Sequence, residues 1–180
     1  MAARILTKPY FSRPTLQVAR SLLRKYLVRK NGRKVLAGRI VEVEAYIGME
    51  DRACHASKGC TARTEVMFGP AGLTYVYLIY GMHHCFNIVT ERAGFPSAVL
   101  VRAVKDVDTQ TLIDGPGRVC RFLAIDRKLN RWDLTVGRAL WVEDRGERVA
   151  PSAITIGRRI GVDYAGIWAK KPWRFRLTEQ

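Results

Sequence analysis

The stretch Val35-Leu-Ala-Gly-Arg-Ile-Val-Glu-Val-Glu-Ala-Tyr46 is the most informative part of the sequence, because its residues alternate in the way that a β-strand requires. One set is apolar, would face the core, and comprises Val41, Val43 and Ala45. The other set would lie on the opposite face and carries two carboxyl groups and a phenol. Its members are Ile40, Glu42, Glu44 and Tyr46. The strand therefore predicts a sheet with a polar row on an otherwise apolar element.

This polar row has two interpretations. Antiparallel sheets commonly expose one face to water, in which case Glu42 and Glu44 would simply be solvated. Alternate strand positions are also about 6.6 Å apart, a separation at which two carboxyl groups can act as the acid and base of a sugar glycosidase. The strand alone leaves both interpretations open.

The segments around this strand predict an α+β fold. Residues 14–27 have the apolar spacing of a helix, with Pro14 at the first helical position, and an extended piece begins near Tyr26. The pair Asn31-Gly32 predicts a hairpin that leads into the strand. A second helix is expected over about 117–127, and further strands at 74–80, 84–90, 98–104, 139–143, 154–156 and 173–177. Because no Pro-, Gly- and Ser-rich linker divides the chain, we expect residues 1–180 to form one domain with helices around a mainly antiparallel sheet.

The chain has a large excess of positive charge. Its 180 residues include 31 Lys and Arg against 16 Asp and Glu, which gives a net charge of +15. A hydrophobic content of 48% excludes a disordered chain, and no apolar stretch reaches the ~20 residues that a membrane-spanning helix needs. The charge predicts a polyanionic partner, with phosphate groups the first candidates. The alternative is a basic surface that only keeps the protein soluble.

The charge is concentrated at the start of the chain. From Met1 to Val41 there are eleven Lys or Arg residues and no carboxyl group; the first is Glu42. An Arg-rich segment without acidic residues can be a mitochondrial transit peptide. These residues, however, have the helix and hairpin patterns of folded structure, and no secretory signal is visible.

The cysteines and histidines do not predict a metal site or a cofactor. None of the four cysteines forms a C-x-x-C pair, which argues against a disulfide framework or a zinc ribbon; they are Cys54, Cys60, Cys85 and Cys120. His83-His84-Cys85 is the only compact group of metal-ligand types. Adjacent strand residues point to opposite faces, so this group would be a poor chelate.

Three other features suggest contact with nucleic acid. Residues 47–72 form a long loop that contains His55, and a loop of this length is typical of a functional site. The tyrosines of the segment Tyr75–Tyr80 could stack on bases, although most strand tyrosines serve packing. Arg102 interrupts the apolar run 98–104 and calls for an anionic partner or a role in ligand binding. The residues leave two classes open, a nucleic-acid hydrolase and a binding module that stacks bases on a sheet.

Five motifs along the chain resemble the alkyladenine (3-methyladenine) DNA glycosylase family. They are Gly38-Arg-Ile-Val-Glu-Val-Glu-Ala-Tyr46, Met67-Phe-Gly-Pro70, Tyr75-Val-Tyr-Leu-Ile-Tyr-Gly-Met82 with Asn87, Gly115-Pro-Gly-Arg118, and Gly166-Ile-Trp-Ala-Lys-Lys-Pro-Trp-Arg-Phe175. The resemblance runs from about Leu6 to Leu177 and places the basic N-terminal residues inside the family's helix and hairpin. It implies a single mixed domain around a curved antiparallel sheet, and excision of damaged purines from duplex DNA.

The resemblance also implies the groups that carry out the reaction. Glu44 is similar to the general base that activates a water molecule, and Arg102 is similar to the arginine that helps to hold this water. A carboxylate suits this step, because it can accept the proton and stabilise the positive charge that develops on the sugar. No lysine occurs from Val41 to Ile47, so we expect hydrolysis without a Schiff base and without lyase activity.

The remaining site residues implied by the resemblance belong to base binding. Tyr46 and Tyr77 are similar to the residues that stack on the two faces of a base flipped out of the duplex. His55 is similar to a pocket histidine at the base edge, and Asn87 to an asparagine that limits the entry of guanine. Tyr80 resembles the wedge that fills the gap left in the duplex.

From this resemblance we expect a monofunctional glycosylase of base excision repair that acts on alkylated adenine, and also on hypoxanthine. Its partner would be double-stranded DNA with damaged purines, and the protein would work as a monomer inside the cell, in a nucleoid or a nucleus, without membrane contact. The alternative from another class is a non-catalytic module that binds damaged DNA or RNA. A sugar glycosidase is the third interpretation.

Overall fold

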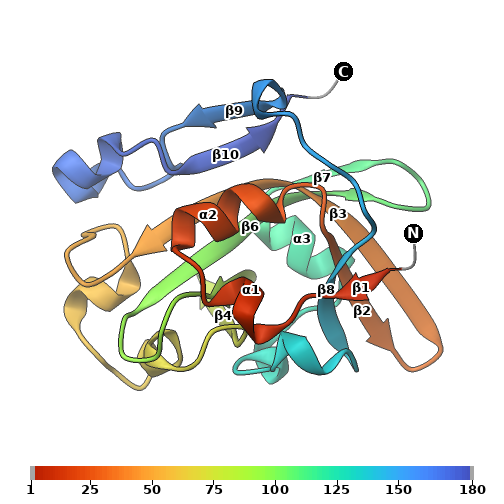
Figure 1. Cartoon of the computed structure of the whole chain (residues 1–180). Helices are drawn as coiled ribbons and strands as arrows, with labels where there is room; N and C mark the ends of the chain where they lie inside the picture. Colours follow the sequence, from red (N-terminus) through yellow and green to blue (C-terminus); the bar gives the residue numbers. More distant parts are fainter. Residues whose placement is uncertain (1–2, 179–180) are drawn as a thin grey trace.

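β3 (Lys34–Ile47) is the strand around which the rest of the sheet is arranged in the structure, a computed structural model that describes residues 3–178 (Figure 1). Its first half pairs with β2 (Tyr26–Asn31), its second half with β10 (Arg174–Leu177), and its other edge with β6 (Ser97–Asp106). The predicted strand and hairpin are therefore confirmed, with Gly32 at φ 60° in the turn. The ends of the expected domain, residues 1–2 and 179–180, lie outside the described residues.

The sheet extends from β3 in both directions in the order β1-β8-β2-β3-β6-β5-β4, and the described strands pair in antiparallel fashion (Figure 1). The other strands on this path are β1 (Arg4–Ile5), β4 (Thr74–Ile79), β5 (His83–Val89) and β8 (Leu140–Asp144). Outside it, β7 (Leu112–Asp114) pairs with β6, and β9 (Ile154–Gly157) pairs with β10. With the helices α1 (Lys8–Phe11), α2 (Thr15–Leu22) and α3 (Pro116–Phe122), the α+β fold is confirmed.

The core lies where the helices pack on the sheet. α2 turns Val18, Ala19 and Leu22 toward β3 and β6, while α3 packs against β5 and β6. The strict alternation predicted along β3 is wrong at Ile40, which belongs to this core and not to the polar row. Register shifts between β3 and β6, on either side of Glu42, explain the difference, because a bulge changes which face the neighbouring residues occupy.

Both helices are shorter than predicted. The first ends at Leu22 instead of residue 27, since Arg24 takes φ 63° and donates its backbone N–H to the Ile40 carbonyl at 2.8 Å. Pro14 is the residue before the first helical position and not the first position itself. The second helix ends at Phe122 instead of residue 127, and Ala124 follows with φ 48°. In each case a residue with positive φ follows the last helical turn, although the apolar residues keep helical spacing beyond it.

The long loop predicted after β3 is confirmed. It contains only the short 3-10 helices η1 (His55–Lys58) and η2 (Glu65–Phe68), and leads to the first residue of β4. Over residues 3–178, no helix is long and apolar enough to cross a membrane.

Candidate active site

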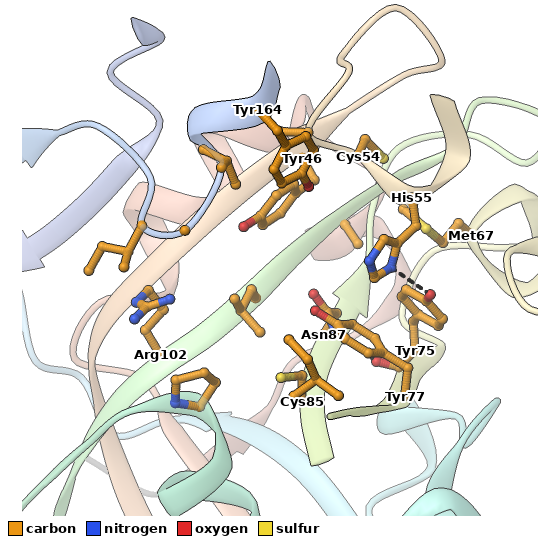
Figure 2. A pocket seen from close by; sticks show the side chains of 18 residues that line it. Tyr46, Cys54, His55, Met67, Tyr75, Tyr77, Cys85, Asn87, Arg102 and Tyr164 are labelled. Carbon is orange, nitrogen blue, oxygen red and sulfur yellow. Dashed lines mark hydrogen bonds between the residues drawn. The ribbon is translucent and has the colours of Figure 1, made fainter. Parts of the chain in front are cut away.

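A pocket of about 140 Å³ lies between the second half of β3, strands β4 to β6 and a segment near the C-terminus (Figure 2). The fold brings five of the residues singled out in the sequence to its wall: Tyr46, His55, Tyr77, Asn87 and Arg102. In Figure 2, Tyr46 lies on the β3 side of the cavity, and His55 and Tyr77 lie across the cavity from it. The pocket wall thus combines four tyrosines and His55 with small and aliphatic residues, and has an arginine at one side.

Glu44 lies fully buried next to this pocket, with an exposed fraction of 0%. Tyr46 donates its hydroxyl to Oε2 of Glu44 at 2.9 Å, and the backbone N–H of Ile160 donates to Oε1 at 2.8 Å. The Arg102 guanidinium is 3.5 Å from Oε2. Burial raises the pKa of the Glu44 carboxyl, whereas Arg102 and these hydrogen bonds oppose the shift. The result is a carboxyl group of increased basicity that is held from three parts of the chain.

Glu42, two residues earlier, has different surroundings. Three guanidinium groups surround its buried carboxyl, at 3.4 Å from Arg102, 3.5 Å from Arg174 and 3.7 Å from Arg176. The prediction that the polar row could face water is therefore wrong for both carboxyl groups, because arginines of β6 and β10 surround Glu42, and groups from β3, β6 and the segment at Ile160 enclose Glu44. Neither carboxyl group is itself among the residues that line the pocket: Glu44 adjoins it through Tyr46, Arg102 and Ile160, whereas Glu42 contacts only Arg102 among these three.

The aromatic side of the pocket is built by β4 and the loop after β3. The Nδ1 atom of His55 and the Tyr75 hydroxyl are 2.8 Å apart, and the rings of His55 and Tyr77 meet edge to face at 4.6 Å. Burial lowers the pKa of His55 to about 4, so its imidazole is uncharged at neutral pH. Asn87 donates its side-chain amide to the Tyr75 carbonyl at 3.1 Å, which holds it in place. These contacts give the pocket a preformed wall.

Tyr80 stands apart from the pocket. It occupies the turn between β4 and β5 with φ 52°, followed by Gly81 at φ 70°, and its side chain is 84% exposed. Met82, in the same turn, is also exposed. The turn therefore presents two large apolar side chains to the surroundings at the end of the hairpin that supplies Tyr77 and Asn87.

Several residues of this site were not recognised in the sequence. Ile160 and Tyr164 line the pocket from a segment more than fifty residues after Arg102, and Cys85 lines it from β5. Arg159 and Asp51 form a fully buried ion pair beside it. Asp51, Arg159, Ile160 and Tyr164 lie in charged or glycine-containing stretches that resemble ordinary surface loops, and Cys85 was considered only as a metal ligand, so no local pattern marked them as pocket residues.

In residues 3–178 no group of three His, Cys, Asp or Glu side chains is arranged to hold a metal ion. The four cysteines are free thiols, of which only Cys60 is exposed.

Comparison with known protein families assigns the chain. The family model described as methylpurine-DNA glycosylase matches residues 9–180. The chain belongs to this family, which makes it a DNA glycosylase, a hydrolase that acts on N-glycosyl bonds. The resemblance inferred from the five sequence motifs is confirmed.

Three relatives illustrate how far the similarity extends. A protein of Myxococcus xanthus named "Putative 3-methyladenine DNA glycosylase" is 55% identical over 97% of this chain and 90% of its own length. A protein of Methanocella arvoryzae with the same name is 48% identical over 95% of this chain and 91% of its own length. A Legionella pneumophila protein, also with this name, is 48% identical over 98% of this chain and 96% of its own length. The similarity therefore covers nearly the whole chain in all three relatives.

Proposed function

We propose that this protein removes alkylated purines, 3-methyladenine first among them, from duplex DNA by hydrolysis, without lyase activity. The observation that carries the proposal is the buried Glu44 carboxyl, held by Tyr46 and Ile160 and adjacent to Arg102 beside an aromatic pocket. In this proposal residues 1–180 act as one domain and as a monomer, inside the cell where the DNA is.

The base enters the pocket only after its nucleotide has turned out of the duplex, because a stacked base cannot reach a closed site. Tyr46 then covers one face of the base and Tyr77 the other, while His55 contacts its edge. Asn87 is fixed by its bond to Tyr75 and can exclude a guanine, whose exocyclic amino group needs additional room. A damaged base costs less to unpair and unstack, which contributes to selection.

Hydrolysis follows from the position of Glu44. The carboxylate accepts a proton from a water molecule that Arg102 helps to hold, and the water oxygen forms a bond to the sugar C1′ atom. The N-glycosyl bond breaks and its electron pair leaves with the base. The negative charge of Glu44 also stabilises the positive charge that develops on the sugar.

The ionisation of the pocket residues favours alkylated bases over neutral ones. The His55 imidazole has a pKa of about 4, and burial raises the pKa of the Tyr77 phenol and of the Cys85 thiol above their usual ranges. At neutral pH the imidazole carries no extra proton for a leaving group. A positively charged 3-methyladenine needs no such proton, whereas hypoxanthine does. We therefore expect alkylated adenine to be the better substrate.

A base-release assay tests this function. Duplex DNA with a single 3-methyladenine or hypoxanthine is incubated with excess protein, and free base and intact abasic strand are measured. We expect release of both bases, faster for 3-methyladenine, with no strand cleavage before alkali treatment. Tight binding of these duplexes without any free base would contradict the proposal and identify a binding module instead.

Tyr80 gives a second prediction, on binding. Its ring is exposed at a turn whose backbone is constrained, so it can enter the gap that the flipped nucleotide leaves. Stacking of one aromatic ring on a base contributes about 1–3 kcal/mol. Tyr80→Ala should therefore weaken binding to a duplex with an abasic analogue about tenfold or more, whereas Tyr80→Phe should bind like the wild type. Fluorescence anisotropy measures both. Equal affinities for all three proteins would refute the wedge role.

A further inference from the structure

Asp51 and Arg159 form a fully buried ion pair at the side of the pocket, and the mechanism proposed above does not use it. The two Arg159 Nη atoms donate to the two carboxylate oxygens of Asp51 at 2.5 and 2.9 Å. Both side chains have an exposed fraction of 0%. Such a fork-shaped contact fixes direction as well as distance, because the guanidinium and the carboxylate are both planar.

This pair connects three segments that are distant in the sequence. Arg159 also donates to the backbone carbonyls of Ala45 in β3 and of Trp168 near the C-terminus, each at 3.0 Å. Asp51 accepts the backbone N–H of Ile47 at 3.3 Å and that of Ala53 at 3.1 Å, at the start of the loop that carries His55. One ion pair therefore joins the catalytic strand, the histidine loop and the C-terminal segment.

The contacts of the pair continue directly into the candidate active site. The Cζ atom of Arg159 lies 4.8 Å from the centroid of the Tyr46 ring and 5.0 Å from that of Trp173. The next residue, Ile160, donates its N–H to Glu44. A shift of Arg159 would therefore move both the ring that forms one wall of the pocket and the donor that holds the carboxylate.

Stability alone does not account for such a pair. Taking two charges out of water is costly, and apolar residues of similar volume are often as stabilising. The benefit of a buried pair is then a defined geometry, and here the geometry concerns the two active-site groups next to it.

We propose that Asp51 and Arg159 are positioning residues of the active site, which keep the Ile160 N–H on Glu44 and the Tyr46 ring against the pocket. The inference deepens the proposed function, since it rests on Glu44 as the general base. A purely structural role is different. If the ion pair only held the three segments together, its loss would affect folding without changing the ionisation of Glu44.

The charged and titratable groups that face Glu44 define what a change at Arg159 would do. They are Arg102 from β6, Arg174 opposite Glu44 on β10, Glu42 and Tyr46 from the same strand, and the Cys85 thiol from β5, together with the Ile160 N–H. The Ile160 bond stabilises the carboxylate and so lowers its pKa. When this bond is broken, the pKa of Glu44 rises further.

Arg159→Lys tests the proposal, because lysine keeps the positive charge but cannot form the two parallel bonds. The matched control is Arg145→Lys. Like Arg159, Arg145 pairs with a carboxylate, that of Glu143 at 2.8 Å, and lies over a tyrosine ring, with its Cζ atom 4.1 Å from the centroid of Tyr26. Unlike the segment that contains Arg159, it does not line the pocket. Two quantities are compared in the three proteins: the Glu44 pKa by carbon-13 carboxyl NMR, assigned with Glu44→Gln, and the single-turnover rate of base release against pH.

We expect Arg159→Lys to raise the Glu44 pKa, to move the acid side of the pH–rate profile to higher pH and to lower the maximal rate about tenfold or more. Arg145→Lys should match the wild type in all three. A folded Arg159→Lys protein with the wild-type Glu44 pKa and profile would overturn the proposal, even if its melting temperature fell. If Arg159→Lys does not fold, the double variant Asp51→Asn/Arg159→Gln, which removes both charges, is measured in its place.

The two measurements separate this inference from the proposed function. Absence of base release by the wild type would contradict the glycosylase mechanism, whereas the carboxyl titration in the free protein would still decide whether Arg159 controls Glu44.

Discussion

Glu44→Gln is expected to lower the single-turnover rate of 3-methyladenine release about 10²–10⁴-fold, the range typical of removing a general acid or base. Glutamine has nearly the same shape: its amide oxygen can accept the Ile160 N–H, which is 2.8 Å from Oε1 in the wild type, and its NH2 group can donate to the Tyr46 hydroxyl oxygen, which is 2.9 Å from Oε2. It cannot accept a proton from water. The measurement is release of free base at saturating protein, with the affinity for the damaged duplex measured in parallel.

The affinity for damaged duplex should change little in Glu44→Gln, because Tyr46, Tyr77 and His55 still form the pocket. A matched control is Asp133→Asn, which alters a half-buried turn carboxyl that accepts the backbone N–H of Thr135 at 2.8 Å and does not line the pocket. It should release base at the wild-type rate. Equal rates for Glu44→Gln and the wild type would show that Glu44 is not the base.

The pH dependence gives an independent check on the same group. Since burial raises the pKa of Glu44 above that of an exposed carboxyl, the base should become protonated, and activity should disappear, as the pH falls through this raised value. The residual activity of Glu44→Gln should not show this decrease at low pH. A raised carboxyl pKa also means that the ionised group opposes folding above that pKa. The free energy of unfolding of Glu44→Gln at neutral pH should therefore not fall below that of the wild type.

The affinity for undamaged duplex should decrease steeply with salt. Contacts to phosphates release counterions, with a slope of about −0.9 per phosphate in a plot of log affinity against log salt concentration. If about six phosphates are contacted, raising salt from about 50 to about 200 mM costs roughly a thousandfold in affinity. The ratio of affinities for damaged and undamaged duplex should change little, because base recognition in the pocket involves no phosphate. A salt-independent affinity would exclude the predicted polyanion contact.

The structure separates the basic residues that can make such contacts. Among the eleven that precede Glu42, Lys25 pairs with Asp144 at 2.8 Å and Arg39 with Glu147 at 3.4 Å, so their charges are partly balanced. Two arginines outside that run, Arg118 and Arg121 on α3, are exposed and border a surface hollow together with Tyr80.

Paired variants test which group binds the duplex backbone. Arg118→Gln/Arg121→Gln should reduce the salt slope by about 1.8, because each of the two arginines that no longer binds a phosphate removes about 0.9 from the slope. The comparison is Arg33→Gln/Lys34→Gln, two exposed residues at the tip of the β2–β3 hairpin. Filter binding over a salt series measures both. A larger reduction of the slope at the hairpin than at α3 would place the duplex on the N-terminal residues.

Local sequence patterns predicted the type of most elements but not their ends. The alternating residues of β3 and the Asn31-Gly32 turn predicted a hairpin that the structure contains, since alternation and turn chemistry act over a few residues. The helix predicted over 14–27 ends at Leu22, because Arg24 bonds to Ile40 and Tyr26 joins the sheet. Hydrogen bonds to distant strands overrode the helical spacing.

The sequence likewise predicted only part of the candidate site. Motif order pointed to Glu44, Tyr46, His55, Tyr77 and Asn87, which lie within 44 positions of one another, and to Arg102 on a neighbouring strand. The burial of the polar row was not predictable, because alternation indicates that two faces differ but not what covers them. The groups that bury this row come from distant parts of the chain: Arg102 of β6, the arginines of β10 and the backbone of Ile160.

By itself, the sequence determined an α+β chain with a basic surface, a carboxylate strand and an aromatic segment that identify its family. The tertiary structure alone decided the chemical state of that carboxylate. Glu44 meets the Ile160 N–H across 116 positions, and Asp51 meets Arg159 across 108. A sequence pattern reports neighbours a few residues apart, whereas basicity and orientation depend on burial and on donors that only the folded chain brings within 3 Å.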